Sequence, residues 1–97
     1  MLTSDEIEAA FSEHSEAEFL EFGRIESPTT KRRDLMAFNL LDSLHPGDRD
    51  IVAAAEHDEI WLDFSTEDLA GKITLEQVIT LLRCGVRCDG GSLCMFA

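Results

Sequence analysis

The N-terminal part of the chain carries apolar residues at the spacing of an amphipathic helix, and the phase is lost near residue 14. Thr3 and Glu6 match the capping box S/T-x-x-E, which marks a helix start. One helical face then collects Ile7, Ala10, Phe11 and His14. On the same wheel Glu18 falls into the apolar stripe, and Ser15 with Glu18 forms a second capping box. The pattern therefore predicts a break near residues 14–15 and a second short helix that ends at Gly23.

A second helical pattern follows Ser27-Pro28, which suits an N-cap serine with proline in the first helical position. His45-Pro46-Gly47 should end this helix after about Leu44. Its apolar stripe is broad and contains Met36, Ala37, Leu40, Leu41 and Leu44, widened by Leu35 and Phe38. A stripe of this width predicts a helix that is covered on more than one side and forms the centre of the core.

Beyond residue 46 the apolar positions change from helical to alternating spacing. Alternation indicates a strand that contains Ile60, Trp61, Leu62, Asp63 and Phe64. Residues 57–59 suit a reversal from a preceding strand at about residues 51–55, although the Ala53-Ala54-Ala55 run is equally compatible with a helix. One helical turn is expected over residues 65–69.

Thr74 and Gln77 form a third capping box, and the helix that follows should end at Gly85. Its buried face is predicted to hold Leu75, Val78, Ile79 and Leu82. Residues 86–88 and 93–96 flank a Gly-Gly turn and predict a closing hairpin. The element order predicts an α+β fold in a single domain, residues 1–97, with N-terminal helices packed on an antiparallel β-sheet and a β-β-α-β-β C-terminal part.

Acidic residues dominate the charge of the chain, with 20 Asp and Glu against 8 Lys and Arg and a formal net charge of −12. Seven of them lie within the first 22 positions, where there is no Lys or Arg: Asp5, Glu6, Glu8, Glu13, Glu16, Glu18 and Glu21. A field of this sign repels nucleic acid and acidic membranes and attracts basic surfaces. We therefore expect these seven residues to bind a basic protein. A merely solvated surface and a halophile-like composition are the alternatives.

Lys31-Arg32-Arg33 is the one basic cluster, and it falls in the first turns of the helix predicted from Pro28. The helix macrodipole disfavours cations at that end. We therefore expect an ion-pair seam between this cluster and the acidic N-terminal segment. Direct nucleic-acid contact by the cluster is the less favoured alternative, because the surrounding charge is negative.

Trp61 shares its strand face with Asp63 and lies opposite the apolar residues of the same strand. If a helix covers that face, Trp61 belongs to the core, which is the expected outcome. If the face is open, an exposed Trp beside carboxylates would suit a binding hot spot.

The reactive side chains form no recognisable catalytic or metal motif. Cys84, Cys88 and Cys94 lack the second ligand pair of a zinc site, and their odd number suits reduced thiols in a cytosol. The three histidines are isolated from one another, and no phosphate or calcium loop is present. We therefore expect no catalytic residues, no metal and no cofactor. Without an apolar run of membrane-spanning length or a signal peptide, a cytoplasmic location is expected.

Three stretches, AEHDEIWLD (residues 55–63), LLRCGVR (81–87) and SLCMF (92–96), resemble the C-terminal half of short proteins encoded in phage and prophage genomes. The resemblance implies an origin in a mobile element. Small acidic phage proteins include anti-CRISPR inhibitors and other DNA mimics, to which this chain is similar in size and charge. The implied function is inhibition of a host nucleic-acid-binding protein, such as a CRISPR surveillance complex, in the host cytoplasm. The alternative is a small phage accessory or regulatory module that binds a partner through an apolar face.

Overall fold

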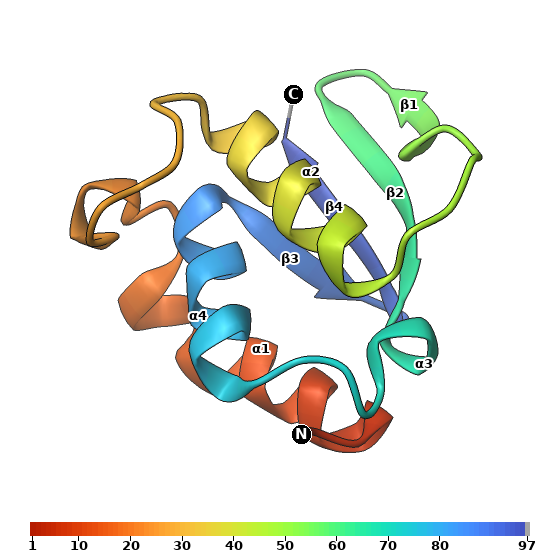
Figure 1. Cartoon of the computed structure of the whole chain (residues 1–97), viewed down its shortest axis with the longest axis horizontal. Coiled ribbons are helices and arrows are strands. Elements are labelled where there is room, and N and C mark those ends of the chain that lie inside the picture. Colours follow the sequence, from red (N-terminus) through yellow and green to blue (C-terminus); the bar gives the residue numbers. More distant parts are fainter. Residues whose placement is uncertain (97) are drawn as a thin grey trace.

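The computed structural model describes residues 1–96 and places helices against one face of a four-stranded sheet (Figure 1). Along the chain the elements are α1 (Ser4–Glu18), the 3-10 helix η1 (Phe22–Arg24), α2 (Arg33–Leu44), β1 (Val52–Glu56), β2 (Glu59–Ser65), α3 (Thr66–Leu69), α4 (Leu75–Cys84), β3 (Val86–Asp89) and β4 (Ser92–Phe96). The predicted α+β fold, with helices first and strands later, is confirmed.

The sheet consists of two hairpins joined through their inner strands. The strand order is β1-β2-β4-β3, and all neighbouring strands are antiparallel. Trp61 of β2 pairs with Cys94 of β4 at the junction. The β3–β4 turn contains Gly90 and Gly91, whose φ angles of 60° and 82° lie in the left-handed region that glycine adopts without strain. Both predicted hairpins are confirmed, and the alanine run belongs to a strand.

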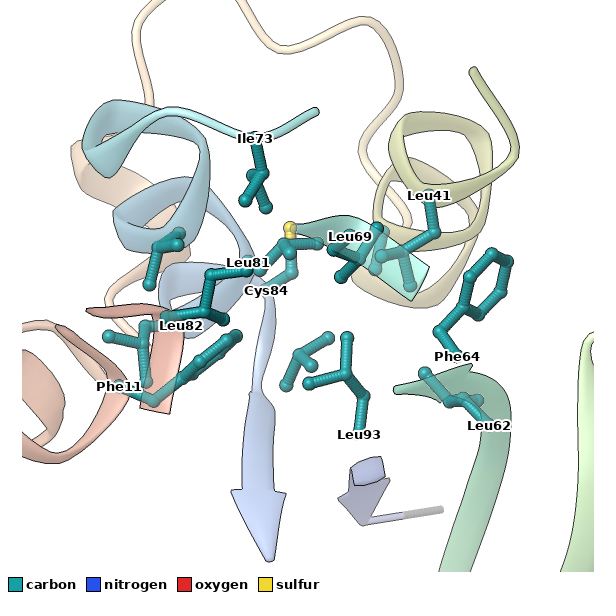
Figure 2. Close-up of a cluster of buried hydrophobic side chains, with 14 of the residues drawn as sticks. Phe11, Leu41, Leu62, Phe64, Leu69, Ile73, Leu81, Leu82, Cys84 and Leu93 are labelled. Atoms are coloured by element: carbon teal, nitrogen blue, oxygen red, sulfur yellow. The ribbon is translucent and has the colours of Figure 1, made fainter. Parts of the chain in front are cut away.

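Helix α4 is the most deeply buried helix, because it packs between α1, α2 and β3. Figure 2 shows its side chains converging with Phe11 of α1 and Leu93 of β4. The buried residues of α4 are Val78, Leu81, Leu82 and Cys84. Leu75 is exposed and Ile79 only partly buried, so the predicted buried face is wrong at these two positions. Because α4 contacts α1, α2 and β3, its buried residues cover a wider part of the helix surface than the single stripe predicted from the sequence.

Helix α2 is buried on one side only. Ala37 and Leu41 are fully buried, whereas Leu35 is 43% exposed. Phe38 and Leu40 are partly buried at the flanks, which accounts for the broad apolar stripe. The prediction that this helix forms the centre of the core is therefore wrong, since α4 occupies that place.

Helix α1 is continuous, so the predicted break near residues 14–15 is wrong. Ser15 does not cap a new helix, because its hydroxyl donates to the carbonyl oxygen of Ser12 at 3.2 Å. The helix ends at Glu18, after which Phe19 has extended backbone and Leu20 has a φ of 65°. The predicted second helix is reduced to the single 3-10 turn η1.

The predicted helix start at Ser27-Pro28 is also wrong. Ser27 has a φ of 49°, whereas an N-cap residue has extended backbone. Helix α2 begins at Arg33 and has Asp34 in its first turn. This later start keeps Lys31 and Arg32 out of the helix and places a carboxylate at its positive end, which the macrodipole favours.

Candidate protein-binding surface

The solvent side of α1 carries five exposed carboxylates, which we call the α1 acidic face: Asp5, Glu6, Glu8, Glu13 and Glu16. The opposite side of the helix holds Ile7, Ala10 and Phe11 in the core, which fixes the orientation of the acidic face. Within residues 1–96, none of the five carboxylates takes part in an ion pair. Their charge is therefore uncompensated and available to a partner.

Glu6 also belongs to the capping box at the start of α1. Its carboxylate accepts the backbone N–H of Thr3 at 2.9 Å, and the Thr3 hydroxyl accepts the backbone N–H of Glu6 at 3.2 Å. The hydrogen bond from the Thr3 backbone lowers the pKa of the Glu6 carboxyl. Glu6 thus stays negatively charged at neutral pH while it fixes the helix start.

Glu18 differs from the other acidic residues of α1 because it points toward α4. Its carboxylate accepts Nε and Nη2 of Arg83, both at 3.3 Å, and pairs with Nη1 of Arg24 at 3.0 Å. The Glu18 side chain is only 12% exposed. Of the seven residues predicted to bind a partner, Glu18 is thus engaged within the fold, while Glu21 is exposed beyond the end of the helix.

The prediction of an ion-pair seam named the wrong basic residues. Within the described part of the chain, Lys31, Arg32 and Arg33 form no ion pair. Arg24 and Arg83 pair with the acidic segment instead. No local pattern in the sequence indicates this pairing, because Arg83 lies 65 positions from Glu18.

A groove of ≈ 480 Å³ runs between α1 and the β3–β4 hairpin; we call it the α1–β3 groove. Phe11, Phe19, Cys88 and Phe96 supply its apolar lining, and Glu8, Glu16 and Arg87 supply charged groups. The rings of Phe19 and Phe96 meet edge to face with centroids 6.4 Å apart. The sequence pattern did not reveal this groove, because Phe19 falls outside the apolar stripe of α1 and Phe96 comes from the last strand. The groove adjoins the α1 acidic face through Glu8 and Glu16.

Arg87 lines the α1–β3 groove, and its side chain is already engaged by Glu59 and Phe96. Its guanidinium pairs with the carboxylate of Glu59 on β2 and lies 4.9 Å from the ring centroid of Phe96. The Arg87–Glu59 pair largely cancels its charge, so the groove and the adjoining helix face keep a net negative character.

Trp61 lies on the outer face of the sheet, opposite the side on which Leu62 and Phe64 are buried. Its side chain is half-buried and lines a shallow hollow with Ala53 and Asp63. The expectation that Trp61 belongs to the core is wrong. Its use as a hot spot for a partner stays a prediction.

The three thiols are unpaired cysteines with suppressed acidity. Burial raises the pKa of Cys84 and of Cys94 to about 11, and it also raises the pKa of Cys88. A thiol with such a pKa is protonated at neutral pH and is a poor nucleophile or metal ligand. Across residues 1–96, no three His, Cys, Asp or Glu side chains lie close enough to hold a metal ion. In the same part of the chain, every helix is too short or too polar to cross a membrane.

No protein-family model matches the chain, and no significant match was found among curated proteins or among solved structures. The resemblance to phage-encoded proteins therefore stays a prediction. The function has to be inferred from the surface that the fold presents.

Proposed function

We propose that the protein is a non-catalytic inhibitor whose α1 acidic face occupies the nucleic-acid-binding surface of a basic partner protein. The five exposed, unpaired carboxylates on one side of a 15-residue helix carry this proposal. Asp5 and Glu16 are 11 residues apart, which is roughly 16 Å along a helix that rises about 1.5 Å per residue. The face thus presents about one charge per 4 Å, close to the roughly 3.4 Å per charge of a single DNA strand.

The resemblance to phage proteins suggests where to look for the partner. A host protein with a basic nucleic-acid groove, such as a CRISPR surveillance complex, is the first class to test. The high pKa values of Cys84 and Cys94 argue against a nucleophilic role for these two thiols at neutral pH.

A second candidate is a protein-interaction module that binds through its apolar surface, and the α1–β3 groove favours it. Phe19 and Phe96 form an aromatic pair at the groove, and Phe96 is 49% exposed. Aromatic residues of this kind are enriched among the residues that dominate binding energy. Salt separates the candidates, because exposed charge pairs are screened at moderate ionic strength while an apolar contact responds little.

The partner can be identified by a pull-down from bacterial lysate followed by mass spectrometry, and its affinity then measured with two variants. In the first variant, Glu13→Lys and Glu16→Lys reverse two charges of the α1 acidic face. The matched control, Glu26→Lys with Asp42→Lys, makes the same change in net charge at exposed positions elsewhere. The first variant should lose affinity at least about tenfold and associate more slowly, whereas the control should lose much less.

DNA should compete with the protein for the partner, and binding should weaken as salt rises. Equal losses in both variants would show that overall charge matters and the α1 acidic face does not. An affinity for the partner that is unaffected by salt and by competing DNA, but is lost in Phe96→Ser, would instead establish the apolar module.

A further inference from the structure

Strand β1 is an open edge of the sheet, at the side opposite the strand β3 that α1 contacts (Figure 1). It pairs with β2 on one side, and all five of its residues are exposed. Natural edge strands are often blocked by Lys, by Pro or by a covering segment, because their unpaired backbone groups accept another strand. The sequence VAAAE has neither Lys nor Pro. Its small side chains leave the backbone accessible to a further strand.

A hollow of ≈ 510 Å³ borders β1 on the inner side of the sheet. Val52 of β1, Ile60 of β2 and Phe38 of α2 contribute to its largely apolar lining. Register places Val52 opposite Leu62 and Ala55 opposite Ile60, so these β1 residues face the same inner side. A strand added along β1 would direct alternate side chains to this side, where the hollow can receive apolar groups.

Acidic residues flank the exposed strand at both ends. Asp48 and Asp50 precede it, and Glu56 and Asp58 end it; all four are exposed, and within residues 1–96 none of them forms an ion pair. Arg49 pairs with Asp63 at 2.7 Å, and Arg33 lines the hollow together with the carboxylate of Asp34. The edge is therefore apolar in its middle and negative at both ends.

This charge pattern disfavours a second copy of the chain as the occupant. In an antiparallel pairing of two β1 strands centred on Ala54, Val52 would oppose Glu56 and Asp50 would oppose Asp58 of the other copy. Like charges would meet at both ends, in addition to the repulsion between two chains of net charge −12.

We propose that β1 is a docking edge for an extended segment of another protein, apolar in its middle and flanked by Lys or Arg on both sides. The segment adds to the sheet as an antiparallel strand next to β1. Backbone hydrogen bonds provide its attachment, the hollow selects its apolar side chains, and the four flanking carboxylates select its charge. This site is separate from the α1 acidic face and does not depend on the proposed function.

Two synthetic peptides test the proposal on the intact protein: Lys-Lys-Val-Thr-Val-Thr-Val-Lys-Lys, and the same peptide with Glu in place of Lys. Binding is followed by NMR chemical shifts and amide hydrogen exchange. The Lys-flanked peptide should bind at least about tenfold more tightly than the Glu-flanked one and slow amide exchange in residues 52–56. Val52→Lys should remove this binding; Val52 is 38% exposed, so the fold tolerates the change.

Charge variants separate the two acidic surfaces. Asp50→Asn with Glu56→Gln should lower the affinity for the Lys-flanked peptide about tenfold. Glu13→Gln with Glu16→Gln on α1 should leave this affinity unchanged. Peptide-induced shifts confined to α1, equal affinity for both peptides, or dimerisation of the chain alone through β1 in sedimentation experiments would each overturn the proposal. The α1 partner is measured separately with the lysine variants of α1, so failure of this proposal and failure of the proposed function are distinguishable.

Discussion

Replacing Glu18 by Gln should destabilise the fold, although Glu18 belongs to the same acidic run as residues whose replacement should leave the stability of the fold nearly unchanged. Its carboxylate accepts two N–H groups of Arg83 and pairs with Arg24, and so connects α1, η1 and α4. Arg83 also donates to the carbonyl oxygen of Arg24 at 3.4 Å. Gln keeps the size of the side chain but removes the charge that binds both guanidinium groups.

The magnitude follows from the exposure of the two partners. The Arg24 side chain is 56% exposed, so its pair contributes about 0–1 kcal/mol. Arg83 is 22% exposed and makes two charge-assisted hydrogen bonds, a class worth roughly 1.5–3 kcal/mol. A carboxylate near a helix C-terminus costs about 0.3–1 kcal/mol, which Gln relieves, and Gln can keep one neutral hydrogen bond. The net loss should be about 1–2 kcal/mol.

Urea unfolding followed by circular dichroism measures this loss as a lower midpoint at unchanged slope. Glu16→Gln is the matched control, because Glu16 is exposed on the same helix and forms no ion pair within residues 1–96; its effect should stay within about 0.5 kcal/mol. A double-mutant cycle with Arg83→Met then isolates the coupling. Equal midpoints for the two Gln variants, or a coupling energy near zero, would refute the assignment of Glu18 to the fold.

Three further predictions concern the core, a helix end and the thiols. Leu41→Ala should cost about 2–5 kcal/mol, whereas Leu35→Ala on the exposed side of α2 should cost under about 0.5 kcal/mol, as measured by chemical unfolding. Gly85→Ala should lower the melting temperature more than Gly71→Ala, because both glycines have positive φ but only at Gly85 would a Cβ come within 2.8 Å of a leucine side chain. Stability should fall as pH rises from 9 to 11, because the pKa of the Cys84 thiol is about 11 in the fold and 9.0 otherwise, so the unfolded chain loses its proton first. Cys84 should contribute roughly 1 kcal/mol of this loss by pH 10 and Cys94, whose pKa is also about 11, a similar amount, so the loss should be smaller in Cys84→Ala.

Local signals in the sequence predicted much of the fold. The capping boxes at Thr3 and Thr74 mark α1 and α4 correctly, because each uses side chains only three residues apart. The Gly-Gly turn and the alternation around Leu62 similarly predicted hairpins from short-range pattern. The capping box at Ser15 failed because α1 already uses the neighbouring backbone groups and a distant arginine holds Glu18.

Long-range contacts explain what the sequence could not predict about the surface. Of the seven acidic residues, helical phase leaves most exposed to solvent, whereas Glu18 is paired within the fold. Only the folded chain brings Arg83 to Glu18. The α1–β3 groove likewise needs Phe19 and Phe96, which lie 77 positions apart, to meet. The open edge of β1 depends on strand order, which periodicity alone does not determine.

Anchoring of α1 in the core means that its row of like charges is preorganised by the whole protein. Asp5 with Glu8, and Glu13 with Glu16, are like-charge neighbours three residues apart, and each such pair disfavours an isolated helix by about 0.2–0.5 kcal/mol. Helices of about 15 residues are already marginal in water. Burial of Ile7 and Phe11 returns roughly 1.5–3 kcal/mol each and so outweighs the repulsion. A peptide cut from α1 would therefore lose the charge spacing on which the proposed recognition depends. Its binding to a partner would have to offset the entropy cost of ordering the helix, which folding of the whole protein has already offset.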